Sequence, residues 1–133
     1  VGTKWNIGTF YPGFGSGGYC IPVSSKYILT GSKRKNKLSI LKEAVKIDNS
    51  INILIAKSII KRKIKKVGIF GLSYKENLKV FALSPVIPFV KYLQKNGVNC
   101  SLFDPYYSKQ EIKKILNIGT FDLSSISKFD CKW

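Results

Sequence analysis

One cysteine of this chain lies at the end of a segment that is rich in glycine. Cys20 follows five glycines that fall within residues 8–18. Glycine tolerates positive φ and lets the backbone approach a ligand closely, so this composition predicts a shaped loop rather than a helix or a strand. A thiol at the end of such a loop can act as a nucleophile in covalent catalysis. The alternative is a buried structural thiol, since free cysteine is among the most buried residue types.

The remaining cysteines and the lack of histidine exclude several kinds of site. The three cysteines stand at positions 20, 100 and 131, a spacing that fits neither a disulfide framework nor a CxxC metal site. The chain contains no histidine, which excludes a histidine-based triad and a histidine-containing zinc site within it. We therefore expect no metal, inert packing roles for Cys100 and Cys131, and a reducing, cytoplasmic compartment.

The chain is strongly basic, with 23 Lys and Arg against 7 Asp and Glu and a formal charge of +16. Such a charge favours polyanionic partners such as nucleic acid, an acidic membrane or a nucleotide phosphate. No helix-turn-helix, RRM or zinc pattern accompanies it, so nucleic-acid binding is the weaker interpretation. The basic runs at residues 33–37 and 61–66 have a plainer interpretation as solvated surface. No apolar run approaches the roughly 18 residues of a membrane span.

Strand and helix patterns alternate in the second half of the chain. Residues 67–71 and 98–103 are short apolar runs that predict strands. Between them, Ser84 and Pro85 mark a helix start, because serine caps a helix and proline costs least in the first turn. Gly97 is the predicted stop of this helix. Its predicted buried face is Val86, Phe89, Val90 and Leu93.

A capping box predicts the start of the next helix. Ser108 and Glu111 precede the apolar residues Ile112, Ile115 and Leu116. Strand, helix, strand and helix in this order predict a βαβα unit with parallel strands and a right-handed crossover. Residues 129–133 are expected to begin a third strand.

A long helix is predicted from Leu38 to about Arg62. Its apolar residues recur at helical spacing and form one broad stripe, which implies packing against another helix in this chain or in a partner. The stripe consists of Ile47, Ile51, Leu54, Ile55 and Ile59. The expected fold class is α/β, with this central helix followed by a truncated, Rossmann-like βαβα parallel-sheet domain.

Three ordered segments resemble the UDP-glucose/GDP-mannose dehydrogenase family. Residues 10–23 (Phe-Tyr-Pro-Gly-Phe-Gly-Ser-Gly-Gly-Tyr-Cys-Ile-Pro-Val) resemble its catalytic-cysteine loop, and residues 43–49 stand where it has its central helix. Residues 67–75 (Val-Gly-Ile-Phe-Gly-Leu-Ser-Tyr-Lys), followed by residues 84–85 and 103–105, resemble the start of its C-terminal nucleotide-binding domain. The Cys-Ile-Pro-Val form is closer to members that oxidise UDP-N-acetylhexosamines such as UDP-N-acetylmannosamine.

The resemblance implies oxidation of a sugar C6 alcohol to a carboxylate with two NAD, in polysaccharide precursor synthesis. A cysteine holds the intermediate aldehyde as a thiohemiacetal, a second hydride transfer gives a thioester, and water hydrolyses it. Cys20 matches that nucleophile. The substrate-binding positions implied by the resemblance are Tyr11, Gly13, Gly17, Tyr74 and Lys75. Of these, Tyr74 and Lys75 match an aromatic-lysine pair that faces the substrate nucleotide.

The resemblance also divides the chain and sets its expected partners. It assigns residues 1–37 to the catalytic-cysteine loop and the start of a helical region, residues 38–66 to a central dimerisation helix, and residues 67–133 to a partial UDP-sugar-binding α/β domain. A homo-oligomer through residues 38–62 is expected, together with a UDP-sugar substrate and no membrane.

Several departures from the family pattern bear on activity. Ser24 replaces an aspartate, Ala82 replaces a substrate-holding arginine and Tyr19 replaces a common histidine. The chain also lacks the GxGxxG fingerprint of the family's N-terminal domain. In the family this domain makes most of the contacts with NAD. We therefore expect a C-terminal fragment that is inactive alone. The alternatives are a truncated copy that only binds UDP or pairs with a subunit and, less favoured, a basic nucleic-acid binder.

Overall fold

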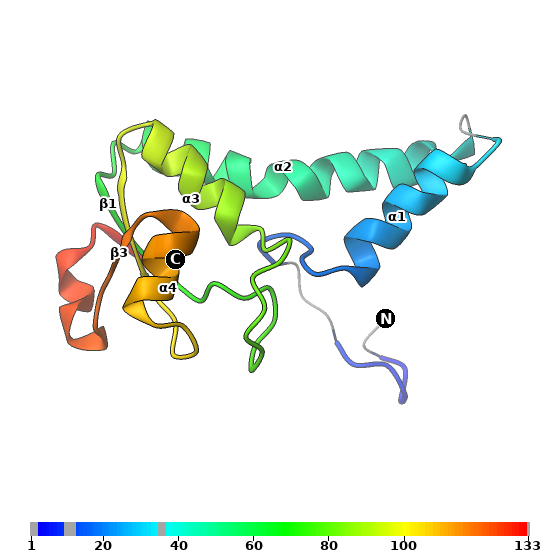
Figure 1. Ribbon diagram of the computed structural model, residues 1–133. Coiled ribbons are helices and arrows are strands. Elements are labelled where there is room, and N and C mark those ends of the chain that lie inside the picture. Colours follow the sequence, from blue (N-terminus) through cyan, green and yellow to red (C-terminus); the bar gives the residue numbers. More distant parts are fainter. Residues whose placement is uncertain (1–2, 10–12, 35–36, 133) are drawn as a thin grey trace.

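A long helix joins a helical arm to a small parallel sheet in the computed structural model, which describes residues 3–9, 13–34 and 37–132 (Figure 1). The arm consists of α1 (Cys20–Gly31) packed against the first part of α2 (Ser39–Lys61). The other elements are β1 (Lys66–Phe70), α3 (Val86–Lys95), β2 (Asn99–Phe103), α4 (Lys109–Leu116), β3 (Gly119–Thr120), the 3-10 helix η2 (Leu123–Lys128) and β4 (Cys131–Lys132).

The sheet has four strands in the order β3-β2-β1-β4, and every pairing is parallel. In its register Val67 lies opposite Cys100 on one side and opposite Cys131 on the other. This confirms the predicted α/β class, the parallel βαβα unit and the third strand near residues 129–133. The prediction missed β3, because a strand of two residues is too short to show a periodic pattern. The strand order reverses at β1, where β2 and β4 lie on opposite sides.

The helix α3 ends where its sequence predicts, but its N-cap is Pro85 rather than the predicted Ser84, and α4 begins at its predicted capping box. The four predicted apolar residues of α3 are all buried, and the helix stops just before Gly97, whose φ is +74°. The Ser84 hydroxyl accepts a hydrogen bond from the Val86 N–H at 3.3 Å, with Pro85 at the N-cap. At α4 both hydrogen bonds of the capping box between Ser108 and Glu111 are present.

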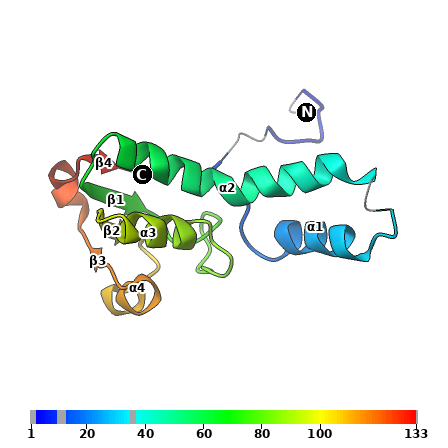
Figure 2. The ribbon, with the colours of Figure 1, turned by 90° about the horizontal axis from the view of Figure 1, so that it is seen from above.

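The long helix is confirmed in extent, but its predicted apolar stripe is only partly buried. The buried residues of α2 are Asn52, Ala56 and Ile59, whereas Ile47 and Leu54 are exposed. The reason is the position of the neighbours: α1 and α3 lie along the same side of α2, toward opposite ends (Figure 2). The other side of α2 faces no element of the described chain.

The core lies between the sheet and the helices that pack on it. Its largest fully buried side chains are Phe89, Ile69, Leu72, Leu93, Leu102 and Ile112. A glycine in β1, Gly68, keeps space for Phe129, because a Cβ there would lie 2.9 Å from the phenylalanine ring. None of the helices in the described ranges is both long and apolar enough to cross a membrane.

Candidate functional site

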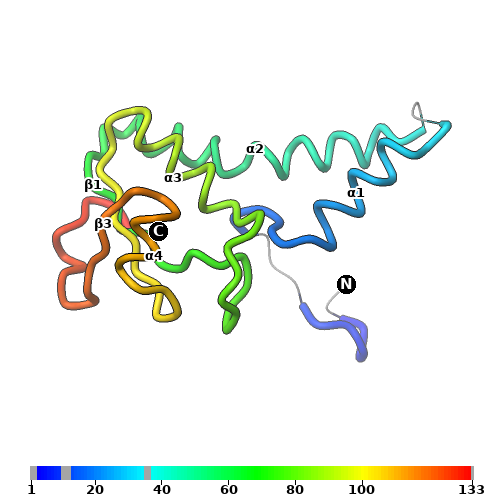
Figure 3. Tube along the Cα trace, viewed as in Figure 1, coloured from blue at the N-terminus to red at the C-terminus, as the bar shows by residue number. Residues whose placement is uncertain are grey.

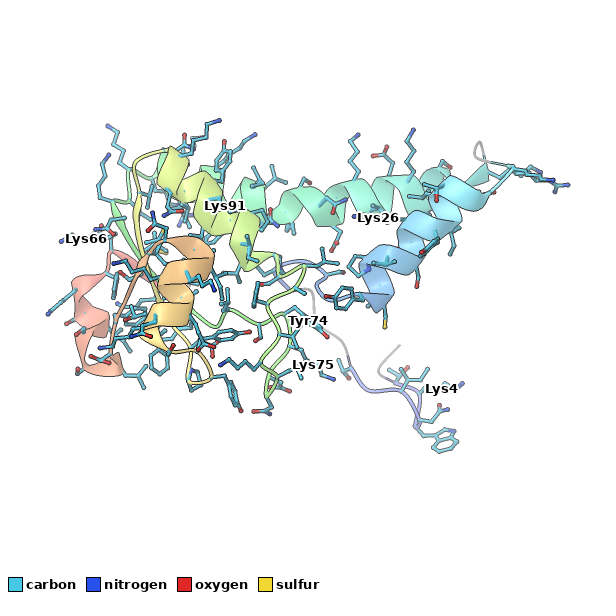
Figure 4. The ribbon with its side chains drawn as sticks, viewed as in Figure 1. Lys4, Lys26, Lys66, Tyr74, Lys75 and Lys91 are labelled. Atoms are coloured by element: carbon cyan, nitrogen blue, oxygen red, sulfur yellow. The ribbon has the colours of Figure 1, made fainter. Side chains whose placement is uncertain are left out.

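The loop after β1 reaches across the molecule and packs on the glycine-rich loop before α1. Figure 3 shows the two segments meeting below the middle of α2, and Figure 4 labels Tyr74 on the first of them. A Cβ on Gly18 would lie 2.6 Å from Cζ of Tyr74, and one on Gly17 would overlap the tyrosine Cβ. Gly18 is buried and has a φ of +75°. Only glycine therefore fits beneath this ring without a rearrangement.

Two further contacts hold the glycine-rich loop. The Ser16 N–H donates a hydrogen bond to Oδ1 of Asp48 on α2 at 2.8 Å. The Phe14 ring packs edge-on against Phe89 of α3, with the ring centroids 4.8 Å apart. The loop is thus fixed by α2, by α3 and by Tyr74, as a shaped loop rather than a linker. Sequence reasoning missed the anchoring role of Asp48, which an acidic residue on a lysine-rich helix signals only weakly.

Cys20 is the first residue of α1, directly after the glycine-rich loop. All three cysteines lie in the described part of the chain, and Cys20 alone is exposed. Cys100 is buried, and burial raises the pKa of its thiol to about 11. Cys100 therefore packs in the core, as predicted, whereas Cys131 is half-buried against it. The exposed thiol of Cys20 contradicts the alternative of a buried structural cysteine.

A cavity of about 380 Å³ lies at the carboxyl ends of β1 and β2. Residues 73–78 and 104–106 line it together with Gly71, so Tyr74 and Lys75 both face this space. In open parallel sheets, ligands bind outside the carboxyl ends of the strands. The position of the cavity therefore makes it the candidate ligand site, which we call the crevice.

A buried carboxylate holds the two loops of the crevice together. Asp104 accepts hydrogen bonds from the N–H of Leu72 and from the N–H of Tyr106, each at 2.8 Å. Gly71, with φ at +86°, donates its N–H to the Phe103 carbonyl at 2.8 Å. Asp104 belongs to the family-like motif at residues 103–105. Its structural role depends on a contact between two loops, which the sequence does not show.

The far end of the β1 loop is anchored on α4. Lys79 forms an ion pair with Glu111 at 2.7 Å, and its Nζ lies 5.1 Å from the Tyr107 ring centroid. The hydrogen bond from Lys79, and then those from Ser108, lower the pKa of Glu111 to about 2. The Val80 N–H donates to the Ser73 hydroxyl at 3.2 Å. These contacts fix the loop in which Ala82 stands.

A second cavity, of about 460 Å³, lies between the glycine-rich loop, α2 and the start of α3. Lys26, labelled in Figure 4, and Asp48 contribute to its lining. Asn52 also lines it, and the side-chain oxygen of this buried residue has no hydrogen-bond partner among the residues that the structure describes.

The predicted site residues fall into two groups. The structure brings Gly17, Tyr74 and Lys75 together at the crevice and its border with the glycine-rich loop. Gly13 and Cys20 lie on the glycine-rich loop and at its end, outside the lining of the crevice. Tyr11 falls outside the described residues.

The sequence model described as UDP-glucose/GDP-mannose dehydrogenase family, UDP binding domain, matches residues 68–131. Residues 68–131 belong to the UDP-glucose/GDP-mannose dehydrogenase family. The matched segment begins in β1 and ends in β4, so it contains β2, β3, most of β1 and the residues that line the crevice.

Three members of this family illustrate how much of a relative the chain spans. It is 34% identical to a UDP-glucose 6-dehydrogenase of Campylobacter jejuni, over 84% of this chain and 28% of that protein. It is 30% identical to a UDP-N-acetyl-D-mannosamine dehydrogenase of Methanococcus maripaludis, over 71% of this chain and 23% of that protein. A solved UDP-glucose dehydrogenase of Pyrobaculum islandicum superposes with a TM-score of 0.77 at 16% identity, over 90% of this chain and 30% of that one. The chain thus spans less than a third of these relatives.

Proposed function

We propose that this chain is the part of an NAD-dependent UDP-sugar dehydrogenase that carries the nucleophilic cysteine and binds the UDP moiety. The observation that carries this proposal is the packing of Tyr74 on Gly17 and Gly18. It joins the two family motifs, which are far apart in the sequence, at one place in the structure. A diphosphate in the crevice would find Lys75, whose ammonium is a compact positive charge.

The proposed chemistry uses Cys20 as the covalent nucleophile. After a first oxidation of the C6 alcohol, the Cys20 thiolate attacks the aldehyde carbon and forms a carbon–sulfur bond. Loss of a hydride from this thiohemiacetal gives a thioester, and water then cleaves the carbon–sulfur bond to release the carboxylate and the thiol. Exposure of Cys20 at the start of α1 supports this role, because a sugar can reach it.

The oxidation requires NAD as hydride acceptor, twice per sugar. The residues of the described chain do not form a dinucleotide site of the Rossmann type. Such a site needs a short glycine-rich turn that leads from a strand directly into a helix. Here β1 is followed by the long loop up to Pro85, and Gly71 opens that loop without a helix behind it. We therefore assign NAD to another part of the protein.

For the substrate class we propose a UDP-N-acetylhexosamine such as UDP-N-acetylmannosamine, in cytoplasmic synthesis of polysaccharide precursors. The Cys-Ile-Pro-Val form at residues 20–23 supports it, as does the similarity to a UDP-N-acetyl-D-mannosamine dehydrogenase. The similarity to a UDP-glucose 6-dehydrogenase favours UDP-glucose as the competing substrate. Assay of both sugars with the whole protein separates the two.

We also propose that α2 pairs with the same helix of a second copy. Three exposed apolar residues follow one another at intervals of seven along α2, namely Ile40, Ile47 and Leu54. This spacing places them on one face of the helix, away from α1 and α3. A helix face of this kind is covered in a stable assembly. Sedimentation analysis tests it: Ile47→Asp combined with Leu54→Asp is expected to give a monomer.

An inactive copy that binds UDP or pairs with a subunit is the second candidate. It is favoured by Ser24 and Ala82, which stand where the family has an aspartate and an arginine. The form of this candidate that binds UDP shares that binding with the enzyme and differs from it only in turnover. Restoring both residues, Ser24→Asp with Ala82→Arg, within the whole protein is expected to raise turnover if the substitutions have inactivated it.

Calorimetric titration with UDP tests UDP binding, which the enzyme and the UDP-binding inactive copy have in common. UDP is expected to bind one site, and Lys75→Ala is expected to weaken binding by about tenfold, the value of one charge-assisted contact. Lys128→Ala removes a lysine outside the crevice and serves as the matched control. A short oligonucleotide that binds more tightly than UDP, with a steep salt dependence, would favour the nucleic-acid binder instead.

A further inference from the structure

Tyr74 lies between the crevice and the glycine-rich loop. It lines the crevice, and it also covers Gly17 and Gly18 of the glycine-rich loop. Its exposed fraction is 37%, so the residue is neither free in solvent nor part of the core. One tyrosine thus forms a wall shared by the crevice and the loop that leads to Cys20.

The side of Tyr74 that faces the glycine-rich loop packs tightly on Gly18. A Cβ on Gly18 would lie 2.6, 2.8 and 3.0 Å from Cζ, Cε2 and the hydroxyl oxygen of Tyr74. These three atoms belong to the outer end of the ring, which rests directly on the glycine backbone. A side chain at position 18 would therefore displace the ring, because real Cβ contacts are not this short.

The rest of the loop is held at its other end. Ser16 is bonded to Asp48 of α2, so the upstream side of the loop is fixed to a long, rigid helix. Between that anchor and Cys20, the first residue of α1, lie Gly17 and Gly18 under Tyr74 and then Tyr19. A displacement of the ring would remove its contact with the backbone that leads into Cys20.

We propose that Tyr74 is a positioning residue that couples occupancy of the crevice to the reactivity of the Cys20 thiol. A nucleoside diphosphate in the crevice contacts one side of Tyr74, and the other side sets the position of Gly17 and Gly18. The ligand thereby orders the segment that presents the nucleophile. This inference rests on the proposed function, because it requires the crevice to bind UDP.

The test measures the alkylation rate of Cys20 by iodoacetamide, by peptide mass spectrometry, from pH 6 to pH 9 with and without saturating UDP. UDP is expected to change the Cys20 rate in the wild type by about fivefold, a common size for coupling between two sites. Tyr74→Phe keeps the ring and retains the effect, whereas Tyr74→Ala loses it. Buried Cys100 is the internal control, since it stays unmodified as long as the fold is intact.

Tyr106→Ala is the matched control, because Tyr106 lines the same crevice but bonds to Asn77 rather than to the glycine-rich loop. At saturating UDP this variant is expected to keep the UDP effect. UDP binding is measured on each variant separately by calorimetry. If wild-type protein binds UDP and its Cys20 rate does not change, the coupling is wrong and the proposed function stands. If the wild type does not bind UDP, both are wrong.

A second measurement needs no ligand and covers the case in which Tyr74→Ala no longer binds UDP. Gly18→Ala is expected to change the Cys20 rate severalfold, because its methyl group displaces the ring. In a Tyr74→Ala background the same substitution meets no ring and is expected to have a smaller effect. Equal effects of Gly18→Ala in the two backgrounds would contradict the proposal.

Discussion

Tyr74 lies across Gly18 so closely that one methyl group on the glycine would overlap the tyrosine ring. The contact joins the loop after the first strand of the sheet to the loop that ends at Cys20. The space that the ring requires explains why residues 17 and 18 are both glycine. The crevice and the exposed cysteine are thereby parts of one arrangement, although they belong to different segments of the chain.

The first prediction concerns the stability of that contact. Gly18→Ala is expected to lower the free energy of unfolding by about 1–3 kcal/mol, because φ is positive there and the new Cβ meets the ring. Gly13→Ala is the control, since its Cβ would meet nothing within 4 Å, and a change within about 0.5 kcal/mol is expected. Guanidinium unfolding measures both. Equal effects of the two variants would show that Tyr74 does not rest on Gly18.

The second prediction concerns the carboxylate that joins the two loops of the crevice. Asp104→Asn is expected to destabilise the fold by about 1–3 kcal/mol, because an amide offers one oxygen where two N–H groups now bond to two. Asp122→Asn is the matched control, since Asp122 is exposed and makes no side-chain cap. Thermal unfolding compares them. A neutral Asp104→Asn would mean that the loops are held by other contacts.

The third prediction concerns the unused acceptor of Asn52. Asn52→Leu removes a buried side-chain oxygen that has no partner in the described part of the chain, and it is expected to raise the free energy of unfolding by about 1 kcal/mol, because burial of an unsatisfied polar atom is costly. Asn49→Leu, at an exposed position of the same helix, is expected to change it little. A loss of stability in Asn52→Leu would indicate that a partner outside the described residues satisfies the amide.

The fourth prediction concerns pH. The hydrogen bond from Lys79 and those from Ser108 lower the pKa of Glu111 to about 2 in the folded chain, from 4.5. The stability that depends on this carboxylate is therefore present above about pH 4.5 and disappears as the pH falls toward 2. Glu111→Gln is expected to flatten the dependence of the urea midpoint on pH between 5 and 2.5.

Glu43→Gln is the control for this pH range. Glu43 forms an exposed ion pair on α2, with 3.3 Å between its Oε2 and the Nζ of Lys46, and exposed pairs of this kind contribute little to stability. The Glu43 variant is expected to keep the wild-type dependence. If Glu111→Gln also keeps it, the ion pair with Lys79 does not anchor the β1 loop.

The sequence predicts those features that depend on neighbours along the chain. The capping box of Ser108 and Glu111, the buried face of α3 and the stop at Gly97 are local, and the structure confirms them. The buried side of α2 is not local, since it depends on where α1 and α3 pack, and within this chain the predicted stripe is exposed at Ile47 and Leu54. The contact of Tyr74 with Gly18 is also long-range, so the sequence could name both residues but not their packing.

The central claim is that the crevice binds the UDP moiety and lies next to the cysteine-bearing loop. Amide NMR of the labelled protein during a UDP titration, at two salt concentrations, tests it most directly. We predict saturable shifts for residues 73–78 that extend to Gly17 and Gly18 and that persist at the higher salt. Shifts confined to the basic run at residues 61–66 and abolished by salt, or no shifts in a well-dispersed spectrum, would contradict the account.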